Sequence, residues 1–163
     1  MRPGQYVIWQ DLFAIVDDGL IPLARYEVIE HAMLAHAKQF PSGISLLVIL
    51  PVGAKPPSPG VQKQVKEILL RMAPSLSCLA YIVEGTGFKG VAARAALIGM
   101  KIFSSRPYPV YVETSMHDVL VKILPHMEKG KTVTSDVNVI AKAITESRNK
   151  WKMAAPTTSP RAP

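Results

Sequence analysis

The apolar positions of this chain form five short strand-like runs, and after the first two runs they alternate with segments of helical spacing. Ile44–Leu50 is an almost continuous apolar run with several β-branched residues, which is typical of a strand covered on both faces. We therefore expect this strand at the centre of a sheet. The five predicted strands are Tyr6–Trp9, Leu12–Val16, Ile44–Leu50, 78–83 and Val110–Glu113.

Apolar residues recur every three or four positions in the segments between and after these strands, which predicts helices. Pro22 suits a first helical turn, because the amide that proline lacks is unpaired there, and Ser115 can cap a later helix. The predicted helices cover residues 23–40, 61–72, 91–103, 116–124 and 135–153. A strand pair followed by repeated helix–strand units predicts an α/β fold, a small mixed sheet of about five strands with packed helices.

The chain of 163 residues is the size of one domain. We expect an α/β domain over 5–127, a basic amphipathic helix over 132–153 and a disordered tail over 154–163. No apolar stretch reaches the roughly 18 residues that a membrane span requires. The first residues lead into an alternating strand and not into an apolar leader, so we expect a cytoplasmic protein without a membrane span. Cys78, the single cysteine, lies in an apolar run and is expected to be buried.

The net charge of +7 is concentrated near the C-terminus. Residues 120–163 contain eight Lys or Arg and three Asp or Glu, whereas residues 1–119 contain eleven and nine. This bias indicates either a solubilising terminal helix, which we favour, or a weak contact of that helix with nucleic acid or an anionic lipid surface. The basic residues on or beside the helix are Lys129, Lys131, Lys142, Arg148, Lys150, Lys152 and Arg161.

Three glycines after the fourth predicted strand have the spacing of a dinucleotide-binding turn: Gly85, Gly87 and Gly90. Glu113 ends the next strand, where an acid could bind a ribose. The turn lies in mid-chain with one strand remaining, whereas such a fingerprint usually follows the first strand of a larger unit. A tight strand-to-helix turn explains the glycines equally well and is the interpretation we favour. Binding of a nucleotide, lipid or other small ligand at this turn is the alternative.

Residues that carry chemistry are not grouped along the chain. The four histidines have no metal-binding spacing, and we expect His31 and His36 at a rim or facing solvent. Asp17 and Asp18 precede a glycine and are expected to form a turn. Glu84 ends a strand and is the best single candidate for a general base, but the sequence shows no nucleophile or oxyanion partner for it. We therefore expect no enzymatic activity, no metal and no cofactor.

The order of elements resembles the STAS superfamily, the sulphate-transporter and anti-sigma-factor-antagonist domains with their stand-alone bacterial members. The similarity covers about residues 5–127. It is carried by Ile44–Leu50 leading through a loop into the helix at Val61, and by the 78–84 strand with its glycine turn. The resemblance implies a non-enzymatic signalling or scaffold module that acts through contact with another protein. Lipid-binding modules of the CRAL-TRIO type share the same outline.

The resemblance also implies a role for Ser58. In the anti-sigma antagonists a serine at the start of the second helix is phosphorylated, and Ser58 lies nearest that position, although prolines replace the aspartate and D-S-S-G-like context of the family. We favour an N-cap role for Ser58, with phosphorylation as the alternative. The predicted partner-binding surface comprises loop 51–60 and the following helix, with Ser58, Val61, Gln62 and Lys63 as its candidate residues.

Overall fold

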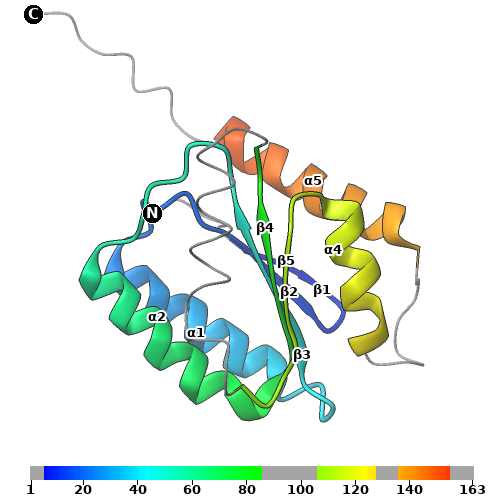
Figure 1. The fold of residues 1–163 in the computed structure, drawn as a ribbon, viewed down its shortest axis with the longest axis horizontal. Helices are drawn as coiled ribbons and strands as arrows, with labels where there is room; N and C mark the ends of the chain where they lie inside the picture. Colours follow the sequence, from blue (N-terminus) through cyan, green and yellow to red (C-terminus); the bar gives the residue numbers. More distant parts are fainter. Residues whose placement is uncertain (1–5, 86–105, 128–135, 155–163) are drawn as a thin grey trace, which may run out of the picture.

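The computed structural model describes residues 6–85, 106–127 and 136–154, and Figure 1 shows their arrangement. The predicted helix at 91–103 and residues 155–163 of the predicted tail lie outside these ranges. Within them, no helix combines the length and the apolar character needed to cross a bilayer. The elements are β1 (Tyr6–Trp9), β2 (Leu12–Val16), α1 (Leu23–Ala37), β3 (Ile44–Leu50), α2 (Pro59–Met72), β4 (Leu76–Val83), β5 (Val110–Glu113), α4 (Met116–Ile123) and α5 (Val137–Ala154), with short 3₁₀ turns at Ala73–Ser75 and Leu124–His126.

The five strands form one mixed sheet in the order β1-β2-β3-β4-β5. β1 is antiparallel to β2, and the three remaining pairs are parallel. β3 is the middle strand, as its continuous apolar run predicts. The predicted fold class, a small α/β domain with a mixed sheet and packed helices, is confirmed.

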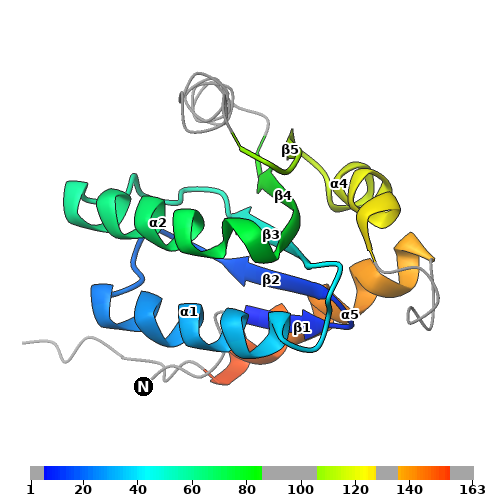
Figure 2. The ribbon, with the colours of Figure 1, turned by 90° about the horizontal axis from the view of Figure 1, so that it is seen from below.

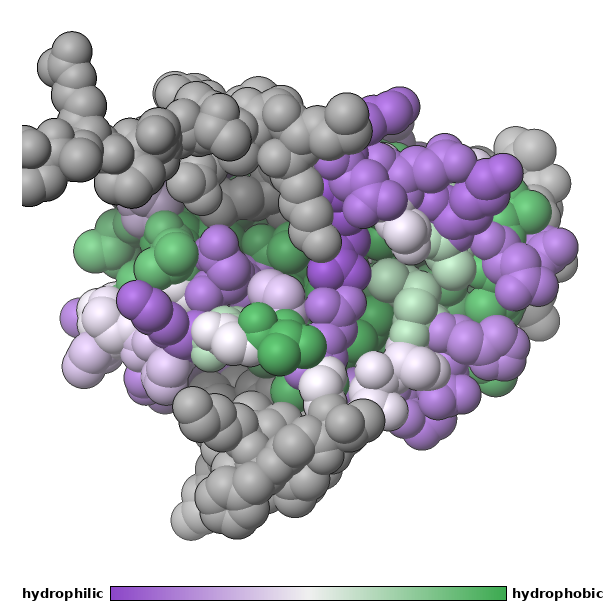
Figure 3. All heavy atoms as spheres, turned by 90° about the horizontal axis from the view of Figure 1, so that it is seen from above, coloured by the Kyte–Doolittle hydropathy of each residue, from purple (hydrophilic) through white to green (hydrophobic). Residues whose placement is uncertain are grey.

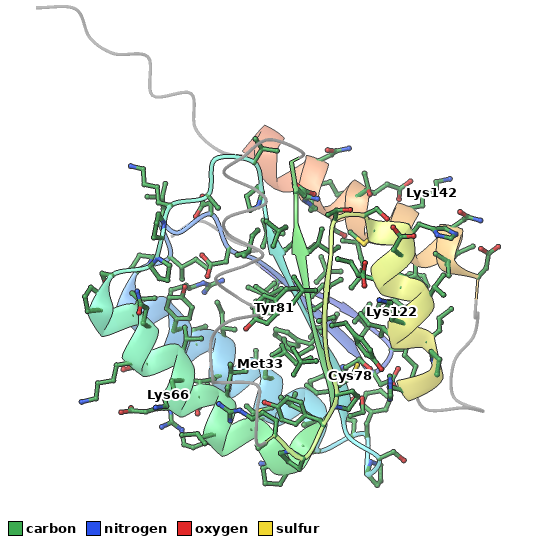
Figure 4. The ribbon with its side chains drawn as sticks, in the orientation of Figure 1. Met33, Lys66, Cys78, Tyr81, Lys122 and Lys142 are labelled. Atoms are coloured by element: carbon green, nitrogen blue, oxygen red, sulfur yellow. The ribbon has the colours of Figure 1, made fainter. Side chains whose placement is uncertain are left out.

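Helices cover both faces of the sheet (Figure 2). From β2 to β5 the sheet grows in one direction, and crossovers of one hand then place their helices on the same face. α1 and α2 accordingly share one face, where Met33 and Met72 pack with Phe13 and Leu46. α4 and α5 cover the opposite face, and Met33, Cys78 and Tyr81 lie in the interior between the layers (Figure 4).

An extra residue in β4 shifts its pairing with β3. Ile44 pairs with Leu76 but Ser45 pairs with Cys78, so Ser77 forms a β-bulge. The bulge puts Leu76 on the α1/α2 face and Cys78 on the α4/α5 face, although strict alternation would place them on the same face. Cys78 is fully buried, as predicted.

α5 belongs to the core of the sheet. Ile140 and Ile144 are both 0% exposed and join the cluster that contains Leu12 and Leu47 from β2 and β3. α5 also contacts β1. The sequence predicts a helix at 132–153 that is separate from the domain at 5–127. In the structure this helix completes the burial of that domain's sheet.

The expectation for His31 is confirmed, because it is exposed, but that for His36 is wrong. His36 is only 6% exposed and lies on the buried stripe of α1, between the rings of Phe13 and Phe40. Its ring bonds to the backbone of Gln10. Burial lowers the pKa of His36, because the interior disfavours the charged imidazolium.

We predict that Ile144→Ala lowers the free energy of unfolding by roughly 2–5 kcal/mol, the usual effect of truncating a buried Ile. Urea denaturation measures this difference. Val139→Ala on the same helix is the control, because Val139 is 42% exposed, and its effect should stay within about 0.5 kcal/mol. A stability of Ile144→Ala equal to that of wild type would show that α5 does not complete the core.

We also predict that acid destabilises the fold through His36. The unfolded chain, in which this imidazole titrates at its ordinary pKa of 6.5, binds the proton more readily than the folded chain does. The contribution of neutral His36 to the free energy of unfolding is therefore complete above about pH 6.5. This contribution is lost as the pH falls through the lower pKa that His36 has in the folded state. Urea denaturation at pH 7.5 and pH 5 should show a smaller loss for His36→Gln than for wild type. His31→Gln, the exposed control, should behave as wild type; equal losses in all three proteins would contradict this assignment.

Candidate functional site

The carboxyl ends of the four parallel strands meet at one edge of the sheet, the position where α/β folds usually bind their ligands. Residues 17–20, 51–58, 84–85 and 114–115 follow these strand ends. Figure 3 looks onto this edge, where green hydrophobic groups lie among purple hydrophilic ones. The edge therefore presents apolar as well as polar groups to solvent.

Backbone hydrogen bonds join the segments that leave the sheet at this edge. They run from the amide of Asp17 to the carbonyl of Ile49 (2.9 Å), from Glu84 to Leu50 (2.9 Å) and from Lys55 to Asp18 (3.0 Å). Gly19 has φ +77°, and a Cβ there would collide with the carbonyl of Lys55. The absence of a side chain at Gly19 thus lets the β2–α1 and β3–α2 loops touch.

Asp17 and Asp18 form the turn that the sequence predicts. The carboxylate of Asp17 accepts hydrogen bonds from the amide of Gly19 (2.8 Å) and the hydroxyl of Tyr26 (2.8 Å), and Asp18 accepts one from the amide of Leu20 (2.9 Å). Burial raises the pKa of Tyr26, and the negative charge of Asp17 raises it further. These two carboxylates organise the loop.

The predicted partner-binding residues lie at the start of α2. Ser58 is exposed and caps the helix as expected, accepting a hydrogen bond from the amide of Val61 (3.4 Å). The side-chain amide of Gln62 donates to the carbonyl of Pro57 (2.9 Å), which ties the first turn to the loop. Gln62 and Lys63 are exposed, whereas Val61 is partly buried against the α1/α2 core. Ser58, Gln62 and Lys63 thus remain accessible.

Three large apolar side chains at this edge are exposed, of which Val52 lies in the predicted loop 51–60, whereas Leu20 and Leu23 lie outside the predicted surface. Val52 is 75% exposed, Leu20 57% and Leu23 49%. A Cβ on Gly60 would lie 4.0 Å from Leu23, so the first turns of α1 and α2 adjoin. Both turns lie at the same end of the helical layer (Figure 1). We call residues 51–63 together with Leu20 and Leu23 the β3–α2 surface.

Gly85, the first glycine of the alternative candidate turn, lies next to the same surface. Gly85 has φ +110°, as a tight turn requires, and a Cβ on it would lie 3.4 Å from the side chain of Val52. Gly87 and Gly90 lie outside the described residues. Glu113 forms an ion pair with Lys122 of α4, and this hydrogen bond raises the pKa of Lys122. The Glu113 carboxylate is therefore already engaged by α4.

Glu84 is held by a residue that the sequence did not associate with it. Arg148 of α5 donates two hydrogen bonds to the Glu84 carboxylate, at 2.6 and 3.0 Å. The side chains are 16% (Arg148) and 29% (Glu84) exposed. This paired geometry gives Glu84 a structural role, because it ties α5 to the end of β4.

The basic C-terminal helix presents fewer free cations than its composition suggests. Arg148 is paired with Glu84, and Lys142 lies 3.9 Å from Glu146 on the same helix (Figure 4 labels Lys142). Lys129, Lys131 and Arg161 lie outside the described residues. In the ranges that the structure covers, no three His, Cys, Asp or Glu side chains come together as a metal site.

Comparisons with known proteins do not assign the chain to a family. No model of a protein family matches the chain, and no curated protein or solved structure is significantly similar to it.

We predict that Glu84 and Arg148 stabilise each other. Glu84→Gln and Arg148→Met should each lower the free energy of unfolding by about 1.5–3 kcal/mol, because each leaves a partly buried charge without its partner. A double-mutant cycle should give a favourable coupling energy of about 1–2 kcal/mol. The exposed pair Lys142 and Glu146 is the matched control, with coupling of at most about 0.5 kcal/mol. Equal coupling in the two pairs would contradict a tie between α5 and β4.

Proposed function

We propose that this protein is a non-enzymatic interaction module of the STAS-like type, which binds another protein through the β3–α2 surface. The observation that carries the proposal is Val52, which is 75% exposed on a loop whose backbone is bonded to its neighbours. Leu20 and Leu23, on the adjoining β2–α1 loop and at the start of α1, add exposed apolar surface at the same edge, and such surface is typical of a contact site for another macromolecule.

The loop between β3 and α2 is held in one conformation by hydrogen bonds and prolines. The amide of Lys55 bonds to Asp18, the amide of Ala54 bonds to the carbonyl of Pro51 (3.0 Å), and Gln62 bonds to Pro57. Four prolines restrict its backbone further: Pro51, Pro56, Pro57 and Pro59. A segment that is already ordered loses little conformational entropy when a partner docks, so more of the contact energy contributes to affinity.

The STAS-like assignment is supported by the order of elements, an antiparallel strand pair followed by helix and strand units that extend the sheet in one direction. Ser58 is exposed at the start of α2 on the proposed surface. A phosphate on Ser58 would add about two negative charges there and alter what this surface binds.

We predict that Val52→Asp removes partner binding without unfolding the protein. A charge at this position would have to be desolvated in the contact, so recovery of the partner should fall at least tenfold while the melting temperature stays unchanged. Quantitative mass spectrometry of proteins cross-linked in cells to the tagged chain measures the recovery.

Val121→Asp is the matched control, because Val121 is 49% exposed on α4, in the opposite helical layer. It should leave recovery of the partner unchanged. The proposal fails if wild type and Val52→Asp recover the same proteins in equal amounts, if Val121→Asp alone loses them, or if no protein is enriched over the tag.

A further inference from the structure

Residues 51–66, which include the loop and the start of α2, carry positive charge only, and Glu67 follows them directly on the helix. Residues 51–66 contain three lysines and no aspartate or glutamate. Lys55, Lys63 and Lys66 are all exposed, and Lys66 extends away from the body of the molecule (Figure 4). Lys55 lies in the same loop as Val52, and Lys63 and Lys66 follow on α2.

These lysines differ from several other basic side chains of the protein in having no ion-pair partner among the described residues. Arg71 is bound by Glu30 through two hydrogen bonds of 2.6 and 2.9 Å, and Lys122 and Arg148 likewise have carboxylate partners. The ammonium groups of Lys55 and Lys63 are thus not held in an ion pair within the described part of the fold.

The nearest carboxylates offset part of this positive charge, but in the described part of the chain none of them forms an ion pair with the three lysines. Asp17 and Asp18, whose side chains accept hydrogen bonds from Tyr26 and from backbone amides of their own turn, border the surface, and the exposed Glu67 follows Lys66. Lysines around an apolar centre are complemented by a segment that has apolar side chains flanked by carboxylates.

We infer, on the basis of the proposed function, that the partner binds the β3–α2 surface through an acidic segment with apolar anchors. The apolar side chains would pack against Val52, Leu20 and Leu23, and the flanking Asp or Glu would face the three lysines. Residues 51–66 contain no arginine, which can bind one phosphate through two hydrogen bonds, and no aromatic residue, which can stack on a base. Nucleic acid therefore fits this surface less well than an acidic peptide segment does.

A random-peptide display library panned on the purified full chain tests the inference even though the partner is unidentified. The selected peptides should be enriched in Asp and Glu beside Leu, Ile or Val. The triple variant Lys55→Glu, Lys63→Glu, Lys66→Glu should bind them at least tenfold more weakly in 0.15 M salt. Binding by wild type should also weaken as salt increases.

The matched control is Lys38→Glu, Lys142→Glu, Lys150→Glu, which changes the net charge equally at positions outside the β3–α2 surface and should bind the acidic peptides within about twofold of wild type. Neutral or basic peptides, unaltered binding by the first triple variant, or an equal loss in the control would overturn the inference. Stronger binding to phosphatidylserine vesicles or to a single-stranded oligonucleotide than to the acidic peptides would overturn it too.

The outcomes also separate this inference from the proposed function. If the selected peptides are neutral and apolar and Val52→Asp no longer binds them, the β3–α2 surface remains the contact site. Only the inferred preference for acidic segments would then be rejected. Failure to enrich any peptide, together with unchanged partner recovery by Val52→Asp, would reject both.

Discussion

The burial of β3 and β4 on both faces is the constraint on which the rest of the structure depends. Each of these strands has a strand on both sides, and their side chains alternate between two separate cores. One core is covered by α1 and α2, because the parallel crossovers place both helices on the same face of the sheet. The other face needs a cover from later in the chain, and α4 and α5 supply it. Ile140 and Ile144 of α5 are therefore essential to the fold, although the helix looks like a charged appendage in the sequence.

This arrangement also determines which loops lie together at the candidate site. The parallel strands all end at the same edge, so the loops after β2, β3 and β4 lie together and share backbone hydrogen bonds. Ion pairs of Glu84 with Arg148 and of Glu113 with Lys122 occupy the two carboxylates at the ends of β4 and β5. Among the described residues at this edge, the accessible groups include the apolar side chain of Val52 and the lysines of the loop and the start of α2. The proposed contact with another macromolecule rests on these groups.

The sequence predicted the strands, most helices and the central place of Ile44–Leu50, because each depends on local periodicity. The bulge at Ser77 interrupts alternation, so the start of β4 was missed. The burial of His36 agrees with its place on the apolar stripe of α1, whereas the polarity of histidine favours a position facing solvent. The pairing of Glu84 with Arg148 could not have been found, because it joins residues 64 positions apart and depends on how α5 crosses the sheet. Ser58 and Lys63 were placed correctly on the surface, whereas the exposure of Val52 depends on the loop conformation.

Amide hydrogen exchange, measured residue by residue by NMR, tests most directly whether the β3–α2 surface is held in place before any partner arrives. The amide of Lys55 bonds to the carbonyl of Asp18 and should be protected to a similar degree as those of Asp17 and Glu84 at the same edge. Exchange of the Lys55 amide at the rate of an unstructured peptide, with β3 and β4 still protected, would contradict the account. The loop would then be ordered only on binding.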